Sequence, residues 1–203
     1  SGCTALVGIE LPKRSEPAVA SKPYSVFNEL GVNYIMPKFD NFVRFVVEDG
    51  GIYSSDEQGI LYYNSVVNGE IVKDNGTLIA CPYGISGTVT VPATTHTVYD
   101  YSFSYSNIRE LSFQEANGQL TEDEFAALPD LVISENAFYY SKLESVKFPS
   151  RLKSLGKNSF SNSSALVDIT FESESRLTEI KDSAFYATAI TLLRIPETVK
   201  TVG

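Results

Sequence analysis

The chain has 203 residues, of which 43% are hydrophobic and 20% charged, so it is long and apolar enough to fold around a core rather than stay disordered. Its net charge of -9 disfavours nucleic-acid binding, which needs a basic patch to neutralise phosphates. No segment approaches the roughly 20 apolar residues that cross a bilayer, and the longest candidate, 42–47, is broken by Arg44. We expect a globular protein with no nucleic-acid partner and no membrane insertion within this chain.

The residue types on which enzymes and metal sites depend are scarce. Neither Cys3 nor Cys81 belongs to a CxxC motif or a Cys/His cluster, so a zinc site is not indicated. The sole histidine, His96, lies in the polar run PATTHTVYD and is interpreted as a surface or strand residue rather than a catalytic base. Nothing marks any two of the 25 acidic residues as a catalytic pair. We expect no enzyme activity and no metal, nucleotide or covalent cofactor; an enzyme would need a site within the unmatched residues 13–75.

The first predicted element is a strand near the start of the chain. Leu6, Ile9 and Leu11 have the spacing L-x-x-I-x-L, and Pro12 follows them directly. Because proline cannot donate a hydrogen bond into a β-ladder, it should end this strand. Residues 13–42 match no repeat, and they are either a long segment outside the coil or a degenerate repeat.

Farther along the chain one pattern recurs. A small residue followed by phenylalanine occurs four times, with the phenylalanine at Phe103, Phe138, Phe160 and Phe185. An aliphatic residue lies five positions before each phenylalanine, at Val98, Ile133, Leu155 and Ile180. After each phenylalanine comes the run L-x-x-I-x-Φ, with the copies Ile108/Leu111/Phe113, Leu143/Val146/Phe148, Leu166/Ile169/Phe171 and Ile190/Leu193/Ile195. The last three copies begin 23 and 24 residues apart. This period lies in the range of leucine-rich repeats, roughly 20–29 residues.

Each period predicts a strand, a turn and a buried phenylalanine. Side chains two apart in I-x-Φ point to one side of a strand, and the residue between them points to the other. In the period that begins at Leu143, Leu152 and Leu155 should face inward, Gly156 permits a turn, and Phe160 fills the wide part of the coil.

A single repeat cannot be stable alone. It buries about five or six apolar side chains, on the order of 10–15 kcal/mol, whereas ordering about 24 residues costs roughly 1–2 kcal/mol each. The repeats must therefore stack into a solenoid and share ladder hydrogen bonds. We expect Val146, Ile169 and Leu193 side by side on adjacent strands.

One step of the repeat is longer than the others. Residues 114–130, QEANGQLTEDEFAALPD, lengthen the step from Ile108 to Leu143 to 35 residues. Within this insertion, Thr121-x-x-Glu124 is a capping-box pattern, which predicts a short helix near 122–127.

The repeat resembles the BspA-type leucine-rich repeat, whose form here is L-x-x-I-x-[IF]-P-x-x-[VL]-x-x-[IL]-G-x-x-[AS]-F. The resemblance covers residues 87–203, with a half repeat at 3–12. Segments 47–63 and 76–92 are similar to a degenerate unit of the family, split by an insertion, NSVVNGEIVKDN, at 64–75. The resemblance implies one right-handed, β-rich solenoid over 1–203, with a single parallel sheet of short strands and little helix: a partial repeat at 1–12, an irregular segment at 13–86 and regular repeats at 87–203.

Both ends of the chain cut a repeat, and we infer a fragment of a longer solenoid. Cys3 in SGC has two interpretations: a lipidated cysteine of a bacterial lipoprotein, or a repeat residue packed in the coil. Cys81, in TLIACP, is interpreted as a small core residue. A Cys3–Cys81 disulfide is a further alternative in an extracellular protein.

The resemblance implies a bacterial protein that is secreted or displayed on the cell surface, and a role in adhesion or protein–protein recognition. We expect a protein partner such as a host matrix or cell-surface protein. The candidate binding face consists of the strand residues that alternate with the core: Glu110, Ser112, Ser145, Lys147, Asp168, Thr170, Leu192 and Arg194. The alternative function is a structural spacer that displays another domain.

Tyrosines gather around the repeated phenylalanine, at Tyr99, Tyr101, Tyr105, Tyr139, Tyr140 and Tyr186. They either pack at the core and its rim or form a recognition stripe, since exposed tyrosine favours interfaces. We expect ligand contact on the sheet face or the inserted segments rather than at the phenylalanine corner.

Overall fold

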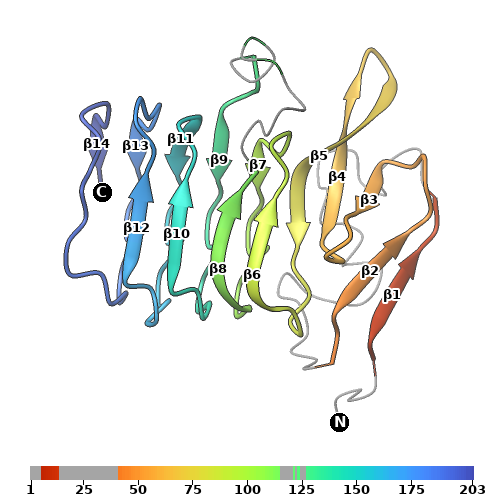
Figure 1. Ribbon diagram of the computed structural model, residues 1–203, viewed down its shortest axis with the longest axis horizontal. Coiled ribbons are helices and arrows are strands. Elements are labelled where there is room, and N and C mark those ends of the chain that lie inside the picture. The colour runs from red at the N-terminus through yellow and green to blue at the C-terminus, as the bar shows by residue number, and fades with distance from the viewer. Residues whose placement is uncertain (1–5, 14–40, 115–120, 122, 124–126) are drawn as a thin grey trace.

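The computed structural model describes residues 6–13, 41–114, 121, 123 and 127–203 (Figure 1). Apart from Asp123, which is helical, the regular elements assigned within these residues are strands, which follow one another in short steps along the chain. They are β1 (Gly8–Leu11), β2 (Arg44–Val47), β3 (Tyr53–Ser55), β4 (Leu61–Val67), β5 (Glu70–Ala80), β6 (Ser86–Val91), β7 (Thr97–Val98), β8 (Asn107–Phe113), β9 (Leu131–Ile133), β10 (Ser145–Phe148), β11 (Leu152–Leu155), β12 (Asp168–Phe171), β13 (Glu179–Ile180) and β14 (Thr201–Val202).

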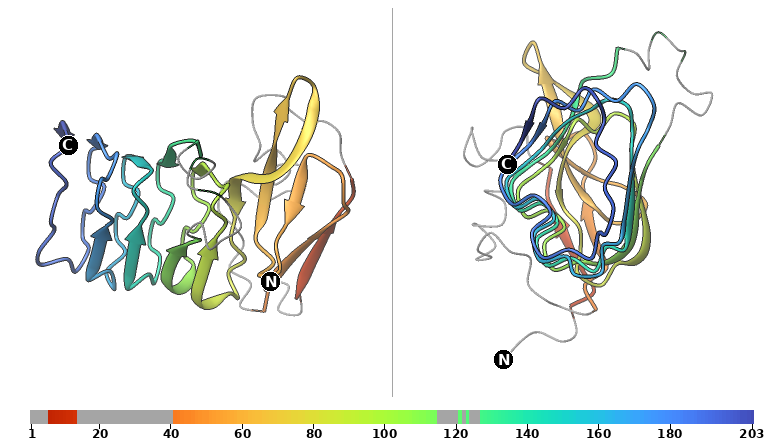
Figure 2. Two further views of the ribbon diagram at one scale, coloured as in Figure 1. Left: turned by 45° about the horizontal axis from the view of Figure 1, so that its top comes forward. Right: turned by 90° about the vertical axis from the view of Figure 1, so that its left-hand side faces the viewer.

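The repeats form a β-solenoid, as predicted. Successive turns of the coil follow one another along the long axis, and they superimpose when viewed end on (Figure 2). Strands β6, β8, β10 and β12 make one parallel sheet. Its register places Val146 of β10 between Leu111 of β8 and Ile169 of β12. The predicted pair of Val146 and Ile169 is confirmed, whereas Leu193 does not join it.

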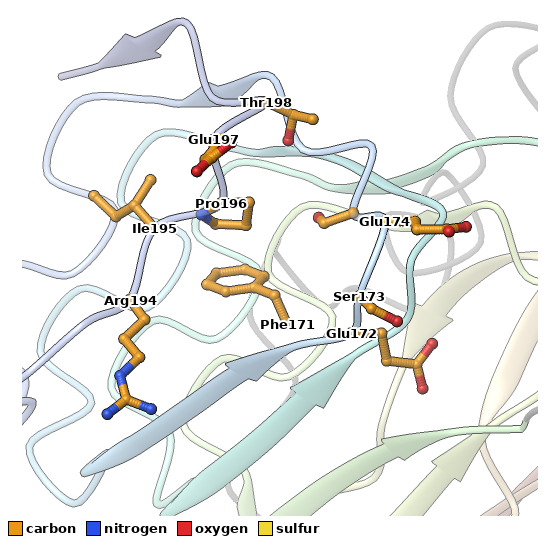
Figure 3. Close-up of a pocket in the computed structure, with 10 residues that line it drawn as sticks. Phe171, Glu172, Ser173, Glu174, Arg194, Ile195, Pro196, Glu197 and Thr198 are labelled. Carbon is orange, nitrogen blue, oxygen red and sulfur yellow. The ribbon is translucent and has the colours of Figure 1, made fainter.

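The last predicted strand does not form. The run Ile190/Leu193/Ile195 should have continued the ladder beyond β12, yet no strand lies between β13 and β14. The backbone N–H of Ala189 still donates to Leu166, after which the chain diverges. A cavity of about 460 Å³ is lined by residues of the segments 171–175 and 194–198, just beyond the end of β12 (Figure 3). Leu193 packs against the core without joining the sheet.

A second sheet replaces the turns that we expected after each proline. Strands β7, β9, β11, β13 and β14 pair in parallel and continue through β5 into the N-terminal part of the chain. The expectation of one sheet was wrong because Leu152 and Leu155 are three residues apart, which is not the alternation of a regular strand. A register shift between Leu152 and Ser154 lets both leucines point inward, as in a β-bulge.

The N-terminal part of the chain departs from the repeat. The predicted strand at Leu6/Ile9/Leu11 is confirmed as β1, but it pairs with β2 in a separate two-stranded sheet. Strands β3, β4 and β5 form an antiparallel meander. The insertion 64–75 is the outer part of the β4–β5 hairpin, whose Asn68-Gly69 turn has φ angles of 53° and 83°, as a tight hairpin requires. This part has its own small core around Phe42, Phe45 and Ile52.

Several expectations fall outside the described residues. They are the lipidation of Cys3, its disulfide with Cys81, the structure of 14–40 and most of the helix expected at 122–127. Cys81 itself is buried in the main core, as predicted.

The phenylalanine corner is the most regular part of the coil. Phe103, Phe138 and Phe160 are fully buried and stack face to face, with 4.8 Å between the ring centroids of each neighbouring pair. Phe185 continues the stack at 5.8 Å. The backbone is joined across the same corner, because the N–H of Phe138 donates to Ser159 at 2.7 Å and that of Phe160 to Ala184 at 2.8 Å. Successive rings are therefore spaced along the solenoid axis in step with the backbone of successive coils.

Two left-handed residues flank every one of these phenylalanines. They lie two positions before and two after the ring: Tyr101 and Tyr105, Asn136 and Tyr140, Asn158 and Asn162, and Ser183 and Ala187, with φ between 53° and 62°. Positive φ is uncommon outside glycine and asparagine. The recurrence of this pair in four coils shows that the corner is a fixed double turn.

Substituting Phe160 by alanine should lower the free energy of unfolding by about 3–5 kcal/mol, because the ring is fully buried between Phe138 and Phe185. Phe185→Ala, at a partly buried position, should cost less. Urea unfolding followed by circular dichroism measures both. A Phe160→Ala midpoint equal to that of the parent would contradict the assigned role of the corner.

The serine that precedes Phe160 gives a second prediction. The hydroxyls of Ser102 and Ser159 are buried without a hydrogen-bond partner among the described residues, and alanine takes the equivalent place at Ala137 and Ala184. Ser159→Ala should therefore leave stability unchanged or raise it by up to about 1 kcal/mol.

Ser163→Ala is the matched control. Its hydroxyl donates to the carbonyl of Phe138 at 2.6 Å and lies 2.9 Å from the hydroxyl of Ser141. Its removal should cost about 1 kcal/mol in the same unfolding experiment. Equal losses in the two variants would show that the hydroxyl of Ser159 does have a partner.

Candidate functional site

The outer face of the sheet β6–β8–β10–β12 gathers most of the predicted binding residues. The strand pairing aligns Glu110, Ser145 and Asp168 in one row, and it pairs Lys147 with Thr170 in the next. The predicted residues of β8, β10 and β12 lie at outward positions and are exposed or partly exposed, whereas the residues between them form the core.

Strand β6 adds two residues to this face that the sequence analysis missed. Thr88 pairs with Glu110 and Thr90 with Ser112, so each row gains one member. The side chains interact in the same order: the Thr88 hydroxyl donates to Glu110 at 3.0 Å, and the hydroxyls of Thr90 and Ser112 lie 3.0 Å apart. The alternation in TVTVP, with Pro after its last valine, could have revealed this strand.

The charged side chains of this face alternate in sign. Lys147 lies 3.1 Å from a carboxylate oxygen of Glu172, which follows the next strand. Arg109, at the edge of the face, is paired with Glu144. These pairs are largely exposed, so each contributes little to stability and is weakened by salt.

The last two predicted residues do not join the rows. Leu192 and Arg194 lie in the segment that diverges from β12, and Leu192 is 70% exposed. Arg194 lies at the rim of the cavity beside Phe171, and its guanidinium extends away from that ring (Figure 3). Pro196 faces Phe171, and Glu172, Glu174 and Glu197 make this end of the face acidic.

A second surface lies over the phenylalanine corner. A shallow groove of about 580 Å³ is lined by side chains from four successive coils, among them Tyr101, Tyr139 and Tyr186. Beside it, the rings of Tyr105 and Tyr140 stack 5.3 Å apart. Partial burial, together with Glu135 and Asp100, raises the pKa of Tyr101, so its hydroxyl stays protonated at neutral pH. The structure thus shows both packed and exposed tyrosines at this corner, with Tyr140 46% and Tyr186 64% exposed.

The chemically reactive residues lie apart from both surfaces. His96 precedes β7 and is half-buried, with its Nδ1 3.0 Å from the Thr97 hydroxyl, and burial lowers its pKa. Burial also raises the pKa of the Cys81 thiol, which disfavours the reactive thiolate. Among the residues described, no three His, Cys, Asp or Glu side chains gather as a metal site would require. None of the described elements is a helix long and apolar enough to span a membrane.

Comparison with protein families gives a match to the region of BspA-type leucine-rich repeats, in six copies over residues 85–131 and 131–203. The chain belongs to this family. The matched residues include all the strands of the two repeat sheets from β8 onward, together with the whole of the phenylalanine corner.

Two crystal structures are similar to this chain. One is the pneumococcal vaccine antigen PcpA, with 21% identity and a TM-score of 0.49 over 98% of this chain and 37% of that one. The other is a leucine-rich repeat protein from Eubacterium ventriosum ATCC 27560, with 16% identity and a TM-score of 0.50 over 96% of this chain and 56% of that one. The chain thus spans 37% and 56% of these proteins. A search of curated proteins finds no match.

The sole histidine of this repeat protein predicts a pH dependence of stability. Because burial lowers the folded-state pKa of His96 below its ordinary value of 6.5, the unfolded chain binds more protons between the two values. The contribution of His96 is therefore fully favourable above about pH 6.5, and it is lost as the pH falls toward the folded-state pKa. Urea unfolding at several pH values across this window should show that the free energy of unfolding falls as the pH falls. His96→Asn should reduce the slope of that free energy against pH. An identical slope in the variant would contradict the assignment.

Proposed function

We propose that this segment is a non-enzymatic protein-recognition module of a secreted or surface-displayed bacterial protein, with a role in adhesion. The observation that carries the proposal is the aligned polar face of β6, β8, β10 and β12. One row of outward side chains, from Thr88 to Asp168, crosses four strands in register. A second row pairs Thr90 with Ser112 and Lys147 with Thr170, and no core residue depends on the identity of these side chains. Such a face can vary in sequence without loss of the fold, as a recognition surface must.

The charges on the face favour a polypeptide partner. Glu110 and Asp168 lie in one row while Lys147 lies in the next, so acidic and basic groups alternate over a short distance. A polyanion would meet repulsion from the acidic residues, and the chain as a whole carries a net charge of -9. A protein segment with alternating charge is the complementary ligand, and its attraction should be modest and salt-sensitive.

The second candidate function is a structural spacer. The observation that favours it is the continuous phenylalanine stack from Phe103 to Phe185, which makes the coil a stiff rod. A rod of this kind can hold a neighbouring domain away from a surface, whether or not its own faces bind a ligand.

Reversal of the basic charge of Lys147 tests the recognition proposal. The variant Lys147→Glu should weaken binding to immobilised host matrix proteins or intact cells by about tenfold, the effect expected for 1.4 kcal/mol. Surface plasmon resonance at low and at physiological salt measures the change, and added salt should weaken the parent more than the variant.

Lys181→Glu is the matched control, because Lys181 is exposed and follows β13 of the other sheet. It changes the net charge in the same direction as the test variant but leaves the proposed face intact, so it should bind as the parent does. Parent binding that survives both the reversal of Lys147 and high salt would contradict the sheet-face site. A parent that binds none of these targets at tens of micromolar would favour the spacer.

A further inference from the structure

The groove over the phenylalanine corner has the form of an elongated binding site. Its lining residues come from four consecutive coils, so its long direction follows the solenoid axis. Tyr139 and Tyr186 occupy the same position, one residue after the stacked phenylalanine, and they are two coils apart. The coil between them contributes Asn158 and Asn162, which lie two residues before and after Phe160.

The lining is aromatic and amide-rich, with one charged group. Tyrosine rings give apolar platforms with a polar tip, and the asparagine side chains give hydrogen-bond donors and acceptors. Within the described part of the chain, the carboxamide of Asn158 makes no side-chain hydrogen bond, while Asn162 uses one N–H to reach Ser161 at 3.0 Å. Glu135 is the sole charged residue among those that line the groove. The groove therefore has no positive charge to attract a polyanion, whereas a basic side chain of a ligand would meet the carboxylate of Glu135.

The spacing of the tyrosines matches a polyproline II helix. Neighbouring coils are separated by about 4.8 Å, so positions two coils apart are roughly 9.6 Å apart. A polyproline II helix rises about 3.1 Å per residue with three residues per turn, or roughly 9.3 Å per turn. Its prolines would meet successive tyrosines once per turn. Its carbonyls, which make no internal hydrogen bonds, would face the amides of the coil between them.

We propose that this groove binds a proline-rich segment of a partner protein in the polyproline II conformation, with a basic residue of the ligand beside Glu135. Aromatic-lined grooves that receive such segments recur among peptide-recognition domains, because the ligand is already extended and loses little entropy on binding. The proposed occupant is a polypeptide, like that of the sheet face, but the two surfaces are different and the groove proposal does not rest on that face.

The test uses a fluorescein-labelled synthetic peptide that contains a PxxP motif and one arginine, titrated with the whole chain by fluorescence anisotropy. We expect saturable binding to the parent. Tyr186→Ser should weaken it about tenfold. Because Tyr186 is exposed, the variant should keep the fold, which circular dichroism checks. Asn158→Gly, which removes the carboxamide at a residue with φ of 53°, should weaken binding several-fold without backbone strain.

Three controls separate the groove from the sheet face and from other ligands. Leu192→Ser, in the same coil as Tyr186 but outside the groove, should leave peptide binding unchanged, as should Lys147→Glu on the sheet face. A peptide with glycine in place of proline should bind at least tenfold more weakly, because it is not held in the extended form. The proposal is overturned if the parent does not bind the peptide, if the glycine peptide binds equally, or if Tyr186→Ser has no effect. Binding of a neutral oligosaccharide in place of the peptide, lost in Tyr186→Ser, would likewise overturn it.

Discussion

The stack of buried phenylalanines is the constraint on which the rest of the coil depends. Phe103, Phe138 and Phe160 lie 4.8 Å apart, which equals the distance between hydrogen-bonded strands. The same spacing thus satisfies ring stacking inside the coil and the backbone hydrogen bonds across the corner. Because both interactions require the same rise per coil, a repeat that shifts along the axis would lose them together.

This common rise turns equivalent positions into columns on the surface. On one side, the strand register aligns Glu110 with Ser145 and Asp168. On another, the left-handed residues at the corner direct Tyr139 and Tyr186 toward one groove. The core residues are nearly identical from coil to coil, whereas the outward residues differ. The fold therefore separates the residues that hold the coil together from those that a partner can recognise.

The repeat strands and the phenylalanine corner could be predicted because each has a strict sequence spacing. The second sheet could not, since Leu152 and Leu155 need a β-bulge to point the same way. Nor could the separate pairing of β1, whose partner β2 follows the unmatched residues 13–42. The tyrosines at the corner were named from the sequence as a candidate recognition stripe, but the groove that three of them line was not predicted. Tyr101, Tyr139 and Tyr186 are far apart in sequence, and only the double turn around each phenylalanine brings them to one surface.

The longest step of the repeat shows why insertions leave these columns in place. The inserted residues lie between β8 and β9. The buried guanidinium of Arg151 fixes the position of the chain just before β9, because it donates to the carbonyls of Pro129 at 3.3 Å and Thr95 at 2.8 Å. Burial lowers the pKa of Arg151 to about 10, so it remains charged at neutral pH while it bridges three coils. The coils on either side of the insertion consequently keep the contact between Phe103 and Phe138. An insertion can change in length or sequence outside this bridge, while the sheet face and the groove keep their geometry.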